Sequence, residues 1–331
     1  MTKLYDNHGR PINYIRLAVT DRCNLRCFYC MPEEGIKYVA KEALLSFEEM
    51  ERLIRVLVKM GIEKVRITGG EPFVRRDMIN FMERLTQIEG IQKVNLTTNG
   101  TVTLQHIDRL KAMGINSVNL SLDCLDKDRF FQITRRDMFD TVMKTFHALL
   151  TAGITTKINA VVMDGQNIQD IIPMVELAKN HAVDVRFIEE MPFNGGDAHY
   201  TNLKWNYKKI LNHIQEKFPS LTKIEDEPSS TSLNYKIDNF KGTIGVIPAY
   251  SRTFCGTCNR IRLTPTGLLK TCLYDDGVFN VRDIMRAGAS DEQIKATFLS
   301  ALGSRAKDGF EAESKRSSQL PVSESMATIG G

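Results

Sequence analysis

The alternation of short apolar runs with amphipathic segments constrains the fold of this chain more than any other feature. Six apolar runs have the pattern of buried strands: 14–19, 64–68, 93–97, 117–122, 155–162 and 184–189. Helix signals lie between them. Ser46 and Glu49 form a capping box for a helix that Gly61 would end, and Asp77 is placed to cap the next helix. Six consecutive βα units predict a parallel sheet with helices on its outside.

The number of βα units sets the expected architecture. A complete eightfold barrel needs two more units, so we predict an α/β fold with an incomplete (β/α)6 TIM-like barrel, open along one side. A doubly wound open sheet stays the alternative, because strand spacing does not separate the two. The rhythm stops after Glu190, where 191–198 has the composition of a loop. We therefore predict two domains, 1–195 and a C-terminal extension, 196–331. In either fold the active site lies at the carboxyl ends of the strands.

Composition and charge exclude several classes of protein. Of the 331 residues, 42% are hydrophobic and 25% are charged, which is ordinary for a globular protein. The net charge of +4 is too small to indicate a nucleic-acid partner, although it allows a local basic pocket. We see no apolar run long enough to span a membrane and no signal peptide at the N-terminus, so we expect a cytoplasmic protein.

The first of two cysteine groups follows the first predicted strand. Cys23, Cys27 and Cys30 have the spacing C-x3-C-x2-C. Three thiolates on such a loop can bind three corners of a cubane iron–sulfur cluster and leave the fourth iron open to a small molecule. The alternative is a structural zinc site. Such sites normally close with four ligands, and none of the six histidines lies near this group.

The second group, Cys255, Cys258 and Cys272, predicts a second cluster with an open iron. The zinc alternative is stronger here, because zinc ribbons also use C-x2-C pairs. Arg260 and Arg262 follow at alternate positions, so on an extended segment they face the same side. Two guanidiniums beside a cluster suit phosphate oxygens, and a solvated surface pair is the alternative.

The first cysteine motif resembles the signature of the radical S-adenosylmethionine superfamily. This resemblance implies a [4Fe–4S] cluster whose open iron holds S-adenosylmethionine, the source of a 5′-deoxyadenosyl radical. It also implies cofactor contacts from Gly70 in the run Gly-Gly-Glu-Pro, from Ser121, and from Tyr29 and Met191 near the adenine. Taken alone, each has an ordinary alternative as a turn glycine, a strand hydroxyl or a core side chain.

Both cysteine triplets, the run Cys-Asn-Arg-Ile-Arg and the terminal Gly-Gly together resemble the GTP 3′,8-cyclase family of molybdenum cofactor biosynthesis, from about residue 8 to the C-terminus. The resemblance implies catalytic roles for Arg260, Arg262, Gly330 and Gly331, the last two in a tail that enters the active site. The implied GTP contacts are Arg16, Arg66, Thr97 (or its neighbour Thr98), Lys157, Arg260 and Arg262. Basic residues on buried strands are costly without a bound anion, which independently supports a polyanion site.

The implied reaction closes a ring within GTP. The radical removes the C3′ hydrogen, C3′ bonds to C8 of guanine, and an electron and a proton complete (8S)-3′,8-cyclo-7,8-dihydro-GTP. The implied cofactors are two [4Fe–4S] clusters and S-adenosylmethionine, with the second cluster holding the guanine. Implied partners are an electron donor, a second copy in a homodimer and the cyclic pyranopterin monophosphate synthase that would take the product. The alternatives are a radical enzyme that modifies peptides and a non-catalytic zinc-binding protein.

Overall fold

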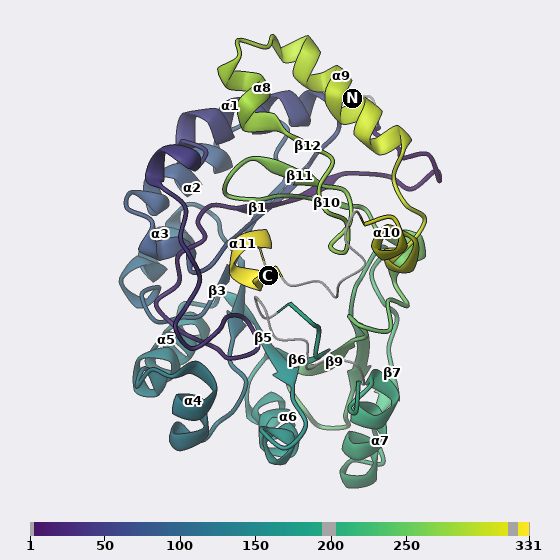
Figure 1. The fold of residues 1–331 in the computed structure, drawn as a ribbon. Helices are drawn as coiled ribbons and strands as arrows, with labels where there is room; N and C mark the ends of the chain where they lie inside the picture. Colours follow the sequence, from purple (N-terminus) through teal and green to yellow (C-terminus); the bar gives the residue numbers. More distant parts are fainter. Residues whose placement is uncertain (1–2, 194–202, 317–323, 331) are drawn as a thin grey trace. The chain divides into compact units, whose positions relative to one another are not determined.

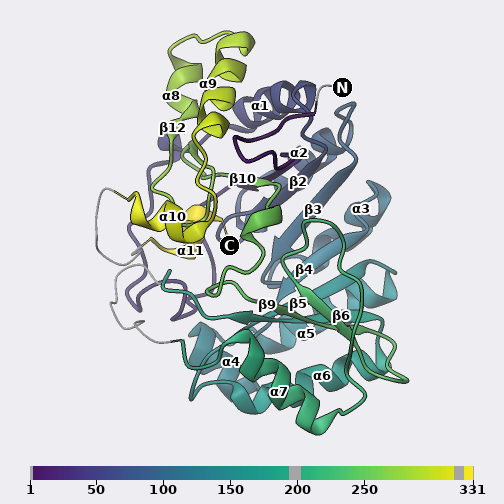
Figure 2. The same ribbon diagram turned by 90° about the vertical axis from the view of Figure 1, so that its right-hand side faces the viewer.

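A computed structural model describes residues 3–193, 203–316 and 324–330 (Figures 1 and 2). The chain divides into two units. Unit 1 comprises 1–24, 36–96 and 255–331, and unit 2 comprises 25–35 and 97–254. This division interleaves segments that are far apart in the sequence. It differs from the predicted domains 1–195 and 196–331, which remain a prediction.

The strands of unit 1 lie in the order β12-β11-β10-β1-β2-β3. Their bounds are β1 Tyr14–Ala18, β2 Lys64–Thr68, β3 Lys93–Thr98, β10 Arg260–Leu263, β11 Leu268–Lys270 and β12 Phe279–Asn280. β1 pairs in parallel with β2 on one side and with β10 on the other, while β11 and β12 are antiparallel. β10, which follows Cys258, thus lies directly beside β1, which precedes Cys23.

The two faces of this sheet differ in chemistry. Ile15 and Leu17 of β1 have no exposed surface, and the same holds for the apolar residues beside them on β2 and β10. The opposite face carries Tyr14 and Arg16, because side chains alternate along a strand. Parallel sheets are usually apolar on both faces, so a polar face on parallel strands indicates a site.

The helices of unit 1 are α1 Phe47–Lys59, α2 Met78–Thr86, α8 Val281–Arg286, α9 Asp291–Gly303, α10 Gly309–Ser314 and α11 Met326–Ile329. The predicted capping box of Ser46 with Glu49 is present at α1. The predicted cap at Asp77 is wrong, since Asp77 precedes α2 with a φ of 61° and its side chain makes no capping hydrogen bond. Arg286 bonds Glu49, so α8 lies beside α1 (Figure 1).

The strands of unit 2 lie in the order β4-β5-β6-β9-β8-β7. Their bounds are β4 Ser117–Ser121, β5 Thr155–Val162, β6 Val183–Glu189, β7 Thr222–Lys223, β8 Leu233–Lys236 and β9 Thr243–Ile247. Pairing is parallel from β4 to β9 and antiparallel at β8 and β7. The helices are α3 Ile107–Ala112, α4 Lys127–Thr134, α5 Phe139–Thr151, α6 Ile171–Asn180 and α7 Tyr207–Lys217. Short 3-10 helices occur in both units. Those of unit 1 are Lys41–Ala43, Pro72–Val74 and Cys255–Thr257, and those of unit 2 are Leu104–His106 and Ile168–Asp170.

All six predicted strands are present, and an α/β fold rich in parallel strands is confirmed. The parallel pairing of β9 with β6 and of β10 with β1 was not predicted, because local spacing does not reveal a partner so distant in the sequence. α7 begins at Tyr207, where the Asn206 side chain accepts a hydrogen bond from the Lys209 amide. None of the described helices combines the length and apolar character needed to cross a membrane.

Candidate functional site

A row of cationic side chains crosses the sheet of unit 1. The strand register places Arg66 of β2, Arg16 of β1 and Arg262 of β10 beside one another. On β11, Lys270 lies opposite Arg262 and extends the row. Arg260 shares this face, two residues before Arg262 on the same strand. The predicted phosphate contacts Arg16, Arg66, Arg260 and Arg262 are therefore brought together on one face, and Lys270 joins them.

Electrostatics within the row show that its charges are close together. Burial lowers the pKa of Arg16 well below its usual value, and Arg262 and Arg66 lower it further. Burial and Arg260 likewise lower the pKa of Arg262. Burial raises the pKa of Tyr14, but the neighbouring cations outweigh it and bring that pKa down to about 8. An anion bound on this face would relieve the repulsion among these cations.

Two of these side chains are held by fixed partners. The Nε of Arg66 donates to the Tyr14 hydroxyl at 2.6 Å, and its Nη1 donates to the Leu96 carbonyl at 3.2 Å. The Nη1 of Arg262 donates to the Gly330 carbonyl at 2.6 Å. Arg66 and Arg262 are thus oriented by protein groups before any ligand arrives.

The C-terminal tail lies over the carboxyl ends of β1 and β2, where Figure 1 places α11. Gly330 has a φ of 79°, and a Cβ there would be 2.9 Å from Thr68 Cγ2 and 3.0 Å from Ala18 Cβ. Upstream, Glu324 Oε2 is 2.5 Å from Nζ of Lys270, whose side chain is fully buried. Gly330 therefore lies within the cationic face, and its catalytic role stays a prediction. Gly331 lies outside the described residues.

The second cysteine triplet belongs to the same unit. Cys255 opens a 3-10 turn in which the Cys258 amide donates to the Cys255 carbonyl at 3.2 Å. Asp275 Oδ2 accepts from the Cys272 amide at 2.8 Å. The three thiols are close enough to influence one another, because Cys258 and Cys255 both raise the pKa of Cys272. Cys258 and Cys272 partly oppose the lowering of the pKa of Arg262 by burial and Arg260, so the triplet adjoins the cationic row.

The donor chemistry of this triplet fits a thiolate-bound cluster. None of the three cysteines forms a disulfide, and all are partly buried. Burial raises the pKa of Cys258, but Arg260 and Arg305 outweigh it and lower that pKa to about 7. Burial raises the pKa of Cys272 to about 11. Thiolate is the form that binds metal, and positive neighbours favour it. Among the described His, Cys, Asp and Glu residues, no group of three could hold a single metal ion.

The Gly-Gly-Glu-Pro run supports the segment that leads to Cys23. The Gly70 amide donates to the Thr20 carbonyl at 2.8 Å, and the Glu71 amide donates to the Arg22 carbonyl at 2.9 Å. A Cβ on Gly70 would be 2.2 Å from the Arg22 carbonyl oxygen. We expected Gly70 to allow the approach of a ligand. The structure shows that it allows the approach of the backbone just before Cys23.

We predict that Gly70→Ala destabilises the protein, because its Cβ would overlap backbone that cannot rotate away. Overpacking of this kind costs about 1–3 kcal/mol. Urea titration of the free energy of unfolding measures the loss. The control is Gly303→Ala, since a Cβ at Gly303 meets nothing within 4 Å. Equal stability of the two variants would show that the loop before Cys23 yields freely to a side chain.

The other two cysteines of the first triplet belong to unit 2, whereas Cys23 belongs to unit 1. Cys27 and Cys30 share a tight turn, with the Cys30 amide donating to the Cys27 carbonyl at 2.9 Å. Between them, the Tyr29 hydroxyl donates to Asp123 Oδ2 at 2.8 Å. Asp123 is fixed in turn by the Val161 amide at 2.8 Å. Burial raises the pKa of Asp123 to about 6. Asp123 therefore orients the predicted adenine contact Tyr29.

The polar face of unit 2 carries other predicted residues. Ser121 lies on the row that includes Asn159 of β5 and Arg186 of β6. Lys157 is less unusual than its strand position suggested, because its Nζ is 2.7 Å from Asp184 Oδ2 on β6. Asp184 therefore compensates the positive charge of Lys157 when no substrate is bound.

The structure distinguishes the two threonines at the end of β3. Thr98 is buried, and its hydroxyl oxygen lies 2.7 Å from Thr103 Oγ1 and accepts from the Gly100 amide at 3.0 Å. Thr97 is only partly buried. Thr97 therefore remains the better candidate for a substrate contact.

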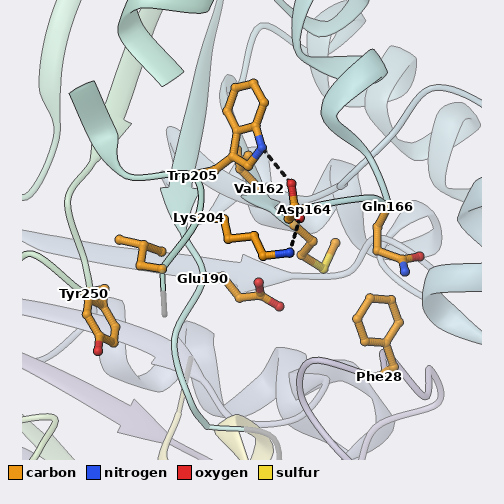
Figure 3. Close-up of a pocket in the computed structure, with 10 residues that line it drawn as sticks. Phe28, Val162, Asp164, Gln166, Glu190, Lys204, Trp205 and Tyr250 are labelled. Atoms are coloured by element: carbon orange, nitrogen blue, oxygen red, sulfur yellow. Dashed lines mark hydrogen bonds and ion pairs between the residues drawn. The ribbon is translucent and has the colours of Figure 1, made fainter. Parts of the chain in front are cut away.

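A pocket of about 220 Å³ opens in unit 2 beside the Cys27–Cys30 turn, where Phe28 is one of its walls (Figure 3). Asp164 lines this pocket and accepts from Trp205 Nε1 at 3.0 Å and from Lys204 Nζ at 2.8 Å. Glu190, which follows β6, lines it too, and the predicted contact Met191 is the next residue. The pocket is thus formed by the cysteine turn and by residues after β5 and β6.

Sequence reasoning missed several residues that support these sites. Asp123 holds Tyr29, and Lys270 extends the cationic row. Arg10 and Arg305 donate hydrogen bonds to the backbone of the second triplet, and Asp6 pairs with both arginines. No local motif marks these residues, because each acts on a segment far away in the sequence.

Two family models match most of the chain. The radical SAM superfamily model matches residues 17–178, and the Molybdenum Cofactor Synthesis C model matches residues 183–310. This chain is similar in structure to SuiB from Streptococcus suis, solved with S-adenosylmethionine bound. The TM-score is 0.61 at 16% sequence identity, and the match covers 87% of this chain and 69% of SuiB. At this identity the likeness establishes the fold alone.

Curated relatives are considerably more similar. Molybdenum cofactor biosynthesis protein 1 of Mus musculus is 42% identical over 91% of this chain, which spans only 47% of that relative. The mitochondrial GTP 3′,8-cyclase of Arabidopsis thaliana is 38% identical, covering 88% of this chain and 75% of its own. The GTP 3′,8-cyclase of Syntrophomonas wolfei is 39% identical, covering 95% of this chain and 98% of its own. The chain therefore belongs to the GTP 3′,8-cyclase family of radical SAM proteins.

Proposed function

We propose that this chain converts GTP to (8S)-3′,8-cyclo-7,8-dihydroguanosine 5′-triphosphate, the first step of molybdenum cofactor biosynthesis. The observation that carries the proposal is the cationic face of unit 1, where Arg66, Arg16 and Arg262 stand in register on adjoining strands. The second cysteine triplet adjoins that face within the same unit. The names of the Arabidopsis and Syntrophomonas relatives support the same substrate and product.

The cationic face suits a nucleoside triphosphate. Guanidiniums donate paired hydrogen bonds to phosphate oxygens. Several of them together can neutralise the negative charge of a triphosphate, which a single side chain cannot. Arg66 is oriented by the Tyr14 hydroxyl, so it is positioned before substrate binds. Lys157 would contribute while sharing its charge with Asp184. We assign Arg16, Arg66, Thr97, Lys157, Arg260 and Arg262 to GTP binding.

The cysteines would hold two [4Fe–4S] clusters, one on Cys23, Cys27 and Cys30 and one on Cys255, Cys258 and Cys272. A reduced cluster with S-adenosylmethionine bound supplies a radical able to remove the C3′ hydrogen of GTP. The chain's own part is to orient the ribose and to exclude water. Arg260 and Arg262 fix the phosphates, and the tail at Gly330 closes over the carboxyl ends of β1 and β2.

We assign Tyr29, Ser121, Met191 and Gly70 to the binding of S-adenosylmethionine. The first three belong to unit 2, and Gly70 of unit 1 acts through the loop before Cys23. The pocket beside Phe28 suits the adenine, since an aromatic wall and nearby polar groups are typical of such sites. We further propose the incomplete (β/α)6 barrel as the frame, a cytoplasmic location, a homodimer, an electron donor and delivery of the product to the cyclic pyranopterin monophosphate synthase.

Anaerobic incubation of the reconstituted, reduced protein with S-adenosylmethionine and GTP tests the proposal. We expect 5′-deoxyadenosine and the cyclised nucleotide to form together, detected by mass spectrometry. Omission of GTP should leave only slow cleavage of S-adenosylmethionine. A zinc-loaded, colourless protein, or cleavage unaffected by GTP, would contradict the proposed function.

Arg260→Ala and Arg262→Ala should each weaken GTP binding. A charge-assisted hydrogen bond contributes about 1.5–3 kcal/mol, so we expect roughly a tenfold to hundredfold rise in Kd by calorimetry. Arg260 is the cleaner test, because Arg262 also bonds the Gly330 carbonyl. Arg286→Ala is the control, since its guanidinium pairs with Glu49 instead. Unchanged affinity in both variants would remove these arginines from the substrate site.

A further inference from the structure

One buried arginine connects the separate segments that carry the second cysteine triplet. Arg305 is 3% exposed. Its guanidinium donates to the Cys258 carbonyl at 3.0 Å and to the Thr271 carbonyl at 2.9 Å. Thr271 directly precedes Cys272, so a single side chain fixes the backbone at two of the three cysteines. It also donates to the Arg260 carbonyl at 2.8 Å, next to the start of the cationic row.

The same guanidinium also contacts a cysteine sulfur. Nη2 of Arg305 is 3.2 Å from Cys258 Sγ, within hydrogen-bonding distance. A donor directed at sulfur favours the thiolate, the form that ligates iron.

A second buried arginine completes the network. Asp6 Oδ2 lies 2.6 Å from Nε of Arg10 and 3.0 Å from Nη1 of Arg305. Arg10 donates through Nη1 to the Cys255 carbonyl at 3.0 Å. Arg10 and Arg305 together therefore hold the backbone at or beside every cysteine of the triplet.

The network also carries excess positive charge. Two buried guanidiniums share the carboxylate of Asp6, whose side chain has no exposed surface. Buried charge is tolerated when an opposite charge compensates it. Cysteine thiolates with a bound cluster would supply that negative charge beside Cys258.

We propose that Arg305 is a positioning residue for the second cluster, setting the spacing of Cys258 and Cys272 and raising the cluster's reduction potential through its hydrogen bond to Cys258 Sγ. The proposal rests on the proposed function, which makes these cysteines cluster ligands. Reduction adds negative charge, so a cationic donor at a ligand sulfur stabilises the reduced state. The potential of a cluster that adjoins the substrate would then be set in part by a residue that touches no substrate.

The experiment isolates the second cluster. In the parent protein Cys23, Cys27 and Cys30 are replaced by serine, so that only the second triplet is reconstituted with iron and sulfide under anaerobic conditions. Iron content and the midpoint potential, followed by electron paramagnetic resonance, are measured for the parent, Arg305→Met and Arg305→Lys. Arg286→Met is the matched control, because its guanidinium also bridges a carboxylate and two backbone carbonyls, those of Glu42 and Leu44.

We expect Arg305→Met to lower the iron content and to shift the midpoint potential of the remaining cluster to a more negative value. Arg305→Lys keeps the charge but not the fork of donors, so its potential should lie between those of Arg305→Met and the parent. Arg286→Met should match the parent. If Arg305→Met does not fold, Arg305→Lys decides, since a potential equal to the parent's would overturn the proposal. A parent that binds no iron would instead refute the cluster assignment, and thus the proposed function.

Discussion

We expect the replacement of Cys255, Cys258 and Cys272 together by serine to abolish the proposed GTP cyclisation and to remove about half of the bound iron. Serine hydroxyls do not ionise near neutral pH, so they cannot replace the thiolates that Arg260 and Arg305 favour at Cys258. The first triplet is unchanged, and slow cleavage of S-adenosylmethionine should therefore persist. Iron analysis, product formation and 5′-deoxyadenosine release measure the three effects separately.

The control for this variant is Cys124→Ser. Cys124 is fully buried, and its Sγ lies 3.5 Å from the Asp126 carbonyl, apart from both triplets in the sequence. Its substitution should leave iron content unchanged. Near-normal cyclisation in the triple variant would show that the second triplet has no part in the reaction, and equal iron loss in both variants would point to general destabilisation.

We expect the removal of Gly330 and Gly331 to reduce the proposed cyclisation at least tenfold, equivalent to about 1.4 kcal/mol of transition-state stabilisation. The structure gives the physical reason at Gly330, whose carbonyl accepts from Arg262 and whose backbone packs against Thr68 and Ala18. Loss of the tail frees Arg262 and opens the carboxyl ends of β1 and β2. The two proposed clusters and the melting temperature should be retained, because α11 ends before Gly330.

A point substitution tests the same idea with the tail present. Gly330→Ala adds a Cβ against Thr68 and Ala18 and requires a left-handed conformation that costs alanine about 1–2 kcal/mol. Gly288→Ala is the matched control, because Gly288 has a φ of 89° but a Cβ there would meet no atom within 4 Å. Gly330→Ala should lose cyclisation and Gly288→Ala should keep it. Full activity in the two-residue deletion would remove the tail from catalysis.

The strands of the parallel sheets could be predicted because the apolar pattern of each one lies within a few consecutive residues. The run 155–162 is apolar at alternate positions and forms β5 with the predicted bounds. The helix cap at Ser46 is equally local. Asp77 failed because a residue type favoured at caps says nothing about the left-handed backbone that it adopts there.

Pairing between distant segments could not be predicted. Arg16, Arg66 and Arg262 were each proposed as substrate contacts, but their alignment depends on β10 pairing with β1 across more than half of the chain. Arg305 had no signal at all, since its partners Asp6 and Cys258 lie far from it in sequence. The motif residues themselves were predictable, whereas the residues that hold them in place emerge only from the fold.

Transfer of deuterium from GTP labelled at C3′ tests the central claim most directly. The reduced, reconstituted protein is incubated with S-adenosylmethionine and the labelled nucleotide, and the 5′-deoxyadenosine is analysed by mass spectrometry. We predict that one deuterium appears in 5′-deoxyadenosine and is missing from the cyclised product. Deuterium retained at C3′ while 5′-deoxyadenosine forms would contradict the proposed cyclisation.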